Sequence, residues 1–163
     1  MVNDGRLADS AFESGIMYAN VQQKGLTEDG YVRFVSAAAG TASNTSDRAV
    51  INVDSIKLQD YPYAVLAYRT NIKCDNVNFN MVTANGTYPA TEKKLFFPQA
   101  RVADGKLQKA YANYKGIYGA AEATDVYLPV WSNSSAVMGA DDYFDVKYIA
   151  FFKTEKEAKA YNG

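Results

Sequence analysis

The clearest alternation of apolar and polar positions lies near the end of the chain. Even-numbered side chains from Phe144 to Phe152 are apolar, whereas Tyr143, Asp145 and Lys147 are polar or amphipathic. A period of two is typical of a half-buried strand, whose alternate side chains face the core and the solvent. We therefore predict a strand that ends at Phe152, with its even-numbered side chains in the core.

The period changes directly after this strand. Thr154 is followed three residues later by Glu157, which is the spacing of a capping box. In that motif the two residues satisfy backbone N–H groups at the start of a helix. The pattern predicts a short helical turn over residues 155–161.

The rest of the chain has the same character. Short apolar or alternating segments are separated by Gly, Asn, Asp and Pro clusters, and no long helical pattern interrupts them. About eight strands without long helices indicate a sandwich or a barrel. We predict an all-β fold, an antiparallel two-sheet β-sandwich (jelly roll), as one module over residues 16–163 after a flexible leader over residues 1–15. The predicted strands are 16–22, 30–37, 48–58, 63–70, 74–82, 94–102, 125–131 and 143–152.

Two long connections flank the strand that carries the only tryptophan. They span residues 103–125 and 132–142, and connections this long in a compact domain are usually functional or partly helical. The first contains Tyr111, Tyr114 and Tyr118, which we expect to form a wall of a binding site.

Alternation along that strand separates its side chains into two sets. Val126, Leu128 and Val130 fall on the core face, which leaves Tyr127 and Trp131 on the other face. Flat rings on an open face can stack on the apolar face of a sugar. We predict this pair as a stacking platform; the alternative is that the single tryptophan belongs to the core.

Neighbouring predicted strands add polar groups by the same parity. Asn78, Asn80 and Arg69 are candidate hydrogen-bonding residues, because amides and guanidinium groups bind vicinal hydroxyls with two bonds. The alternative is an ordinary solvated sheet face.

Composition excludes several classes of function. The net charge of −1 provides no cationic field for nucleic acid or an anionic membrane, and no apolar run is long enough to span a bilayer. Histidine is absent and Cys74 is the only cysteine, so His-based catalysis, an intramolecular disulfide and a thiolate zinc cluster are excluded.

A glycosidase without histidine would need two paired carboxylates. Nothing in the spacing marks such a pair among Glu13, Asp54, Asp125 and Asp145.

Asp141 and Asp142 lie in a polar loop and are candidate ligands for calcium, together with loop carbonyls. Their spacing matches no EF-hand. We expect no required cofactor and consider calcium only as a structural ion.

The segment from Asp142 to Tyr161, with weaker support from Tyr61 to Asn71, resembles part of a known module type. Its Tyr-Ile-Ala-Phe-Phe run and Thr-Glu-rich turn look like the last strand of jelly-roll, galactose-binding-type carbohydrate-binding modules. Such modules occur in large secreted or surface-attached proteins of anaerobic Gram-positive bacteria. The resemblance implies two antiparallel sheets, a glycan bound on a concave face or in end loops, and in some cases a structural calcium.

These observations favour a non-catalytic module that targets a larger secreted protein to polysaccharide or glycan. Its expected partners are the glycan and other domains of the same parent chain, outside the cell or at its surface. A second hypothesis is a structural or adhesive spacer domain without a sugar site. A third is a small glycan-active enzyme that uses paired carboxylates.

Overall fold

The computed structural model describes residues 16–18, 20–42, 48–73, 80–83, 101–130 and 137–163. These residues form nine strands and one short helix. The elements are β1 (Ile16–Tyr18), β2 (Val21–Leu26), β3 (Val32–Ser36), β4 (Arg48–Lys57), β5 (Tyr63–Thr70), β6 (Asn80–Thr83), β7 (Gln108–Asn113), β8 (Glu122–Pro129), β9 (Tyr143–Phe152) and α2 (Glu155–Ala160).

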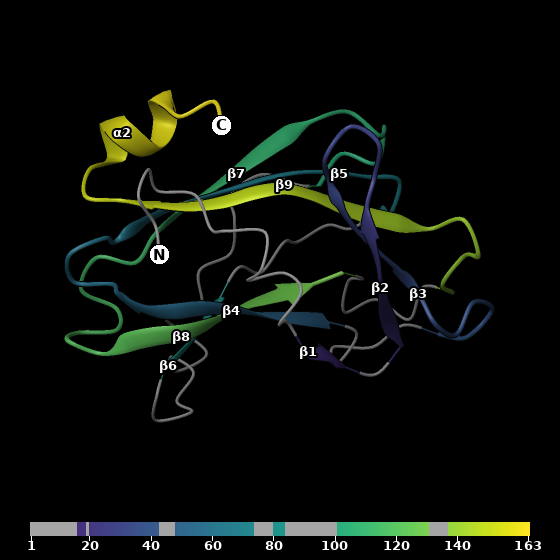
Figure 1. Cartoon of the computed structure of the whole chain (residues 1–163), viewed down its shortest axis with the longest axis horizontal. Coiled ribbons are helices and arrows are strands. Elements are labelled where there is room, and N and C mark those ends of the chain that lie inside the picture. Colours follow the sequence, from purple (N-terminus) through teal and green to yellow (C-terminus); the bar gives the residue numbers. More distant parts are fainter. Residues whose placement is uncertain (1–15, 19, 43–47, 74–79, 84–100, 131–136) are drawn as a thin grey trace.

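The strands form two sheets that pack face to face. One sheet has the order β1-β4-β8-β6, the other has the order β2-β3-β9-β5-β7, and every pairing is antiparallel. Figure 1 shows them as two layers, with α2 beyond the layer that contains β9. The predicted antiparallel two-sheet sandwich with a short C-terminal helical turn is confirmed.

One strand lies where the sequence predicted a connection. β7 falls inside the segment 103–125 and pairs with β5 at the edge of the five-stranded sheet. Its inward side chains are Ala110 and Ala112. Because alanine is small and only weakly hydrophobic, the alternation along this strand is not evident in the sequence. Of the predicted strands 74–82 and 94–102, residues 74–79 and 94–100 lie outside the described residues.

The prediction for the last strand was right in extent and, up to Val146, in facing, but it was wrong in facing beyond Lys147. β9 spans the predicted residues, but the register of its pairing with β5 shifts beside Lys147. The extra residue of this bulge changes the parity. Phe144 and Val146 therefore face the other sheet, whereas Tyr148 and Ala150 belong to a separate cluster on the opposite face.

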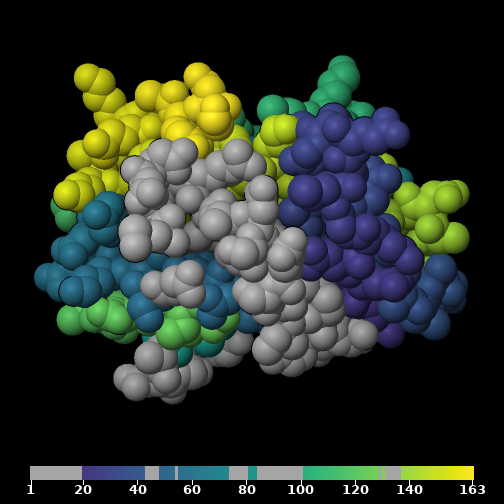
Figure 2. Space-filling model, viewed as in Figure 1, coloured from purple at the N-terminus to yellow at the C-terminus, as the bar shows by residue number. Residues whose placement is uncertain are grey.

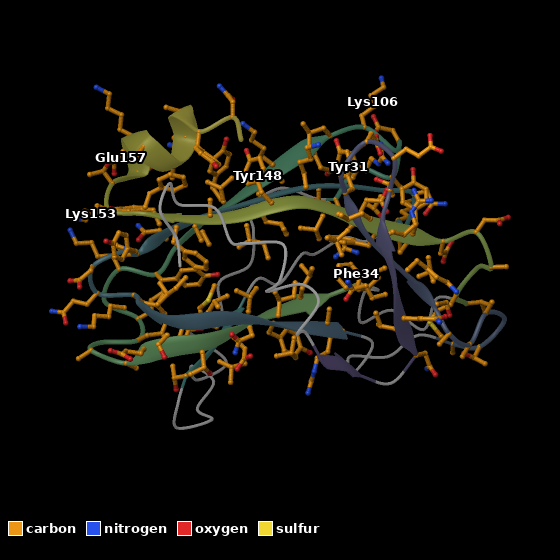
Figure 3. All side chains as sticks on the ribbon, viewed as in Figure 1. Tyr31, Phe34, Lys106, Tyr148, Lys153 and Glu157 are labelled. Carbon is orange, nitrogen blue, oxygen red and sulfur yellow. The ribbon has the colours of Figure 1, made fainter. Side chains whose placement is uncertain are left out.

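The main core lies between the two sheets. Phe34 and Phe144 are fully buried there, and the Phe144 ring stacks on Tyr68 with centroids 4.9 Å apart. Figure 3 shows Phe34 between the layers and Tyr31 and Tyr148 on the outer side of the five-stranded sheet. Burial of each phenylalanine contributes about 2 to 3 kcal/mol to the free energy of unfolding.

Helix α2 covers one end of the outer face of the five-stranded sheet. The predicted capping box is present: the Thr154 hydroxyl accepts from the Glu157 N–H, and the Glu157 carboxylate accepts from the Thr154 N–H. Ala158 is buried against Val65 and Tyr148. In Figure 2 this C-terminal segment and the β2–β3 hairpin occupy opposite ends of the visible face, in yellow and purple.

At the hairpin end, a buried carboxylate joins three neighbouring strands. Asp145 on β9 is 0% exposed and lies in register with Arg33 on β3 and Arg69 on β5. Arg33 donates to it from Nε and Nη2 at 2.7 and 2.8 Å, and Arg69 donates from Nε at 2.8 Å. Two guanidinium groups thus satisfy a charge that would be costly to bury alone.

We expect Asp145→Asn to lower the free energy of unfolding by about 2 to 4 kcal/mol, because it removes the counter-charge of Arg33 and leaves Arg69 with Asp29 alone. Urea denaturation of both proteins measures the change. Asp29→Asn is the matched control, since Asp29 also pairs with Arg69 but is exposed, and its effect should be much smaller. Equal effects of the two substitutions would contradict the role given to burial.

Candidate functional site

The outer face of the four-stranded sheet carries Tyr127 and Arg48. The side chains of Val126, Leu128 and Val130 are fully buried, as their parity predicts, and Tyr127 on the opposite face is half-buried. Arg48 donates from Nη1 to the Tyr127 hydroxyl at 3.0 Å, and its guanidinium carbon lies 4.5 Å from the ring centroid. The cation therefore covers one side of the ring and fixes its orientation.

Polar residues of three strands lie in register around this pair. Tyr127 on β8 is paired with Val50 on β4 and with Asn80 on β6. In the next row of this face Asp125 is paired with Asn52, and its carboxylate accepts from the Thr124 hydroxyl at 2.8 Å. The backbone register thus brings two of the predicted site residues, Tyr127 and Asn80, side by side.

Two other predicted residues of this surface, Trp131 and Asn78, lie outside the described residues, and so does the side chain of Asn80. Their roles stay predictions. The end of β8 before the tryptophan is nevertheless held firmly, because the buried side chain of Arg101 donates from Nη1 to the Val130 carbonyl.

Arg69 does not join this surface. It lies on β5, in the other sheet, and its guanidinium group is on that sheet's outer side with Asp145 and Asp29. The hypothesis that Arg69, Asn80 and Tyr127 share one face is therefore wrong. Parity within a strand fixes the side of a residue relative to its own sheet, but it does not tell which strands share a sheet.

The three tyrosines predicted as a loop wall are divided between different parts of the fold. Tyr114 is 1% exposed in the main core, where burial raises the pKa of its phenol well above the usual value. Tyr118 contacts its ring edge-on at 5.7 Å and accepts from the Met81 N–H at 3.1 Å. Tyr111 packs in the outer cluster beneath α2. Tyr114 is thus a core residue, and the three rings form no common wall.

The predicted calcium ligands have partners within the protein. The Asp142 carboxylate accepts from the Gly139 N–H at 2.8 Å, and the Asp141 carbonyl accepts from the Asn71 side chain at 2.8 Å. Calcium requires about six to eight oxygens. No group of three or more acidic, His or Cys side chains that could hold a metal occurs in the described part of the chain. Calcium stays a prediction that this local arrangement does not favour.

A second polar surface, missed by the sequence prediction, surrounds Arg33 and Arg69. Arg69 donates from Nη1 and Nη2 to the Asp29 carboxylate, and its guanidinium group lies 4.0 Å from the Tyr31 centroid. Arg33 lies 4.5 Å from the centroid of Tyr143. The arginines were visible in the sequence as polar interruptions of apolar strands, but Asp29, in the turn, gave no signal.

Hydrogen bonds and charge shift the pKa values of this second surface. The hydrogen bonds from Arg69 and Thr27 lower the pKa of Asp29 to about 2. The hydrogen bond to Asp145 raises the pKa of Arg33. Burial lowers the pKa of Arg69, but its bonds to Asp29 and Asp145 outweigh that effect and raise it. Both arginines are therefore permanently charged.

Comparison with solved structures identifies proteins of the same fold. The chain superposes on a β-1,3-glucan-binding CBM6 from Bacillus halodurans with a TM-score of 0.51 and 11% identity, over 90% of this chain and 94% of that one. It superposes on the second N-terminal cellulose-binding domain of Cellulomonas fimi β-1,4-glucanase C with a TM-score of 0.52 and 9% identity, over 94% of both chains.

A third neighbour contains the fold as part of a longer chain. It is the CBM22-1 and GH10 modules of a Clostridium thermocellum endo-1,4-β-D-xylanase, with a TM-score of 0.50 and 11% identity over 94% of this chain and 29% of that one. No protein-family model and no curated protein matches the sequence.

These likenesses establish the class of fold. The chain is an antiparallel two-sheet β-sandwich with the architecture of carbohydrate-binding modules. Over the described ranges, no helix has the length and apolar character needed to cross a membrane.

The low pKa of Asp29 predicts a pH-dependent contribution to stability. A carboxyl whose pKa is lowered on folding, here from 3.8 to about 2, stabilises the folded state above pH 3.8. That contribution is lost as the pH falls through 2. The stability difference between the protein and Asp29→Asn should therefore shrink between pH 4.5 and pH 2, as measured by urea midpoints. A difference that does not change with pH would show that Asp29 titrates normally.

Proposed function

We propose that this chain is a non-catalytic carbohydrate-binding module that targets a larger secreted or surface-attached protein to polysaccharide or glycan. The observation that carries the proposal is the pair Tyr127 and Arg48, held together on the outer face of the four-stranded sheet. Neighbouring backbone positions on this face are Asn52, Asp125 and Asn80. The likeness of the fold to glucan-binding and cellulose-binding domains supports the same function.

The chemistry of this surface suits a neutral sugar. An aromatic ring offers a flat apolar area to the axial C–H groups of a pyranose, and guanidinium and carboxylate groups satisfy hydroxyls beside it. Arg48 already fixes the ring, so a sugar contacts a preorganised pair and little side-chain entropy is lost on binding. The contacts that one ring and a few polar groups provide are limited, so we expect a modest affinity.

The arrangement of carboxylates supports a binding role over catalysis. Asp145 is fully buried and satisfied by two arginines, which suits a structural role. Asp125 faces the opposite side of the sandwich, on the other sheet. Those two therefore cannot flank one glycosidic bond, as an acid and a base or nucleophile must.

One observation favours the alternative of a structural or adhesive spacer. Tyr111, Tyr114 and Tyr118, which were expected to face a ligand, make contacts within the fold. If no glycan binds, the outer face around Tyr127 is the surface on which a neighbouring domain or a protein partner would lie.

A glycan array with the purified domain, in calcium and again in chelator, tests the proposal. We expect selective binding to a β-linked polysaccharide. Tyr127→Ala should weaken it about two- to tenfold, because aromatic contacts contribute about 0.5 to 1.5 kcal/mol. Trp131→Ala should weaken binding as well.

Tyr61→Ala is the matched control, because Tyr61 is an exposed ring that packs against Lys153, between β9 and α2, and its substitution should leave binding unchanged. If the domain binds none of the plant, mucin and microbial glycans on the array, the result would contradict the carbohydrate-binding function and favour the spacer domain. Binding that survives both Tyr127→Ala and Trp131→Ala would place the sugar elsewhere.

A further inference from the structure

The outer face of the five-stranded sheet contains an open hollow at its hairpin end. The hollow has a volume of about 460 Å³. It lies on the opposite side of the sandwich from Tyr127. Its lining comes from the β2–β3 hairpin and from the two arginines: Lys24, Gly25, Leu26, Thr27, Glu28, Asp29, Arg33 and Arg69.

A glycine opens the space above Arg33. Gly25, Arg33, Asp145 and Arg69 form one row of paired residues across β2, β3, β9 and β5. Directly paired residues of antiparallel strands present their side chains on the same face. Gly25 has no side chain, and a Cβ built there would meet no atom within 4 Å. The guanidinium group of its neighbour therefore borders open space.

Hydrogen bonding leaves one end of Arg33 available. Asp145 occupies Nε and one hydrogen of Nη2, and Tyr143 lies over the guanidinium plane. Among the described residues, Nη1 has no hydrogen-bonding partner, and the Arg33 side chain is 36% exposed. Arg69 differs, because Asp145 and Asp29 engage all three of its nitrogens.

The Nη1–Nη2 end of a guanidinium group is a planar fork that matches a carboxylate. Asp145 holds the fork of Arg33 rigidly, so little ordering is needed when a ligand binds. A register shift of β2 lies beside Lys24, an exposed residue that lines the same hollow and adds a second cation. Asp145 and Asp29 balance the charges of Arg33 and Arg69, and Glu28 balances Lys24 at the rim, so the fork geometry of Arg33, not a net positive charge, selects the carboxylate.

The remaining lining suits a sugar ring attached to the carboxylate. Leu26 is 62% exposed and offers an apolar contact for ring C–H groups. The Glu28 carboxylate can accept hydrogen bonds from hydroxyls. A carboxylate without a sugar ring, such as acetate, would need neither the apolar contact with Leu26 nor the hydrogen bonds to Glu28.

We propose that this hollow is a second binding site, which takes the carboxylate of an acidic saccharide such as a uronic acid residue on the fork of Arg33. The choice of a saccharide rests on the proposed function. The site is separate from the Tyr127 surface, so one module can contact a neutral and an acidic part of a glycan with opposite faces.

NMR titration of the intact domain with oligogalacturonate, and with a neutral oligosaccharide of equal length, tests this site. We expect oligogalacturonate to shift the amides of the β2–β3 hairpin, with an affinity that falls as salt is added. Lys24→Gln should weaken binding about two- to fivefold, since an exposed charge pair contributes little. Glu28→Gln should strengthen binding by a similar factor.

Arg33→Lys should weaken oligogalacturonate binding about tenfold, because lysine keeps an ion pair with Asp145 but has no fork for a second carboxylate. Lys24→Gln and Glu28→Gln alter exposed residues without disturbing the buried pair, so they test the site even if Arg33→Lys is unstable. Equal binding of acetate would contradict a saccharide ligand. Equal affinity in Lys24→Gln, Glu28→Gln and the unsubstituted protein would contradict the site itself.

Tyr127→Ala separates this proposal from the function of the other surface. It should weaken the binding of a neutral glycan about two- to tenfold and leave oligogalacturonate binding intact. Loss of both responses would show that a single site, at Tyr127, binds all glycans, and would overturn the second site. Binding of oligogalacturonate without any neutral glycan would contradict only the function proposed for the Tyr127 surface.

Discussion

The burial of Asp145 between two arginines is the constraint on which the five-stranded sheet depends. A carboxylate with no exposed surface requires counter-charges, and both must come from the strands on either side. This condition fixes the register of β3, β9 and β5, because a slip of one residue would turn Asp145 away from Arg33 and Arg69. It also fixes the direction of the Arg33 fork, so the same ion pairs that hold the sheet preorganise a polar surface at its hairpin end.

The bulge beside Lys147 lets one strand serve two cores. Before it, the inward side chains of β9 are Phe144 and Val146; beyond it they are Ile149 and Phe151, whereas Tyr148 and Ala150 turn outward. The second cluster that results accepts α2 through Ala158. The outer face is thus divided into an apolar end covered by the helix and a charged end that stays open.

The two sheets give the molecule two different outer surfaces. The surface of the four-stranded sheet has an aromatic ring fixed by one cation, which favours contacts with neutral sugar rings and hydroxyls. The surface of the five-stranded sheet has guanidinium groups fixed by buried and exposed carboxylates, which favour a planar anion. Their chemistry differs because Tyr31 on the second surface is buried against both Arg69 and Lys147, whereas Tyr127 is half-buried and packs against one cation.

The class of fold, most strand positions and the capped helical turn could be predicted from the sequence, because these follow from periods and motifs within short segments. The sequence also placed Tyr127 outward from Val126 and Leu128 correctly. It did not determine which strands share a sheet, so it grouped Arg69 with Tyr127 although they lie on opposite sides of the sandwich. Tyr114 was assigned to a wall and lies in the core, since an amphipathic ring suits either environment. Strand order, the bulge and the pairing of Asp145 were decided only by the tertiary structure, because they depend on contacts between residues far apart in the chain, which no local period records.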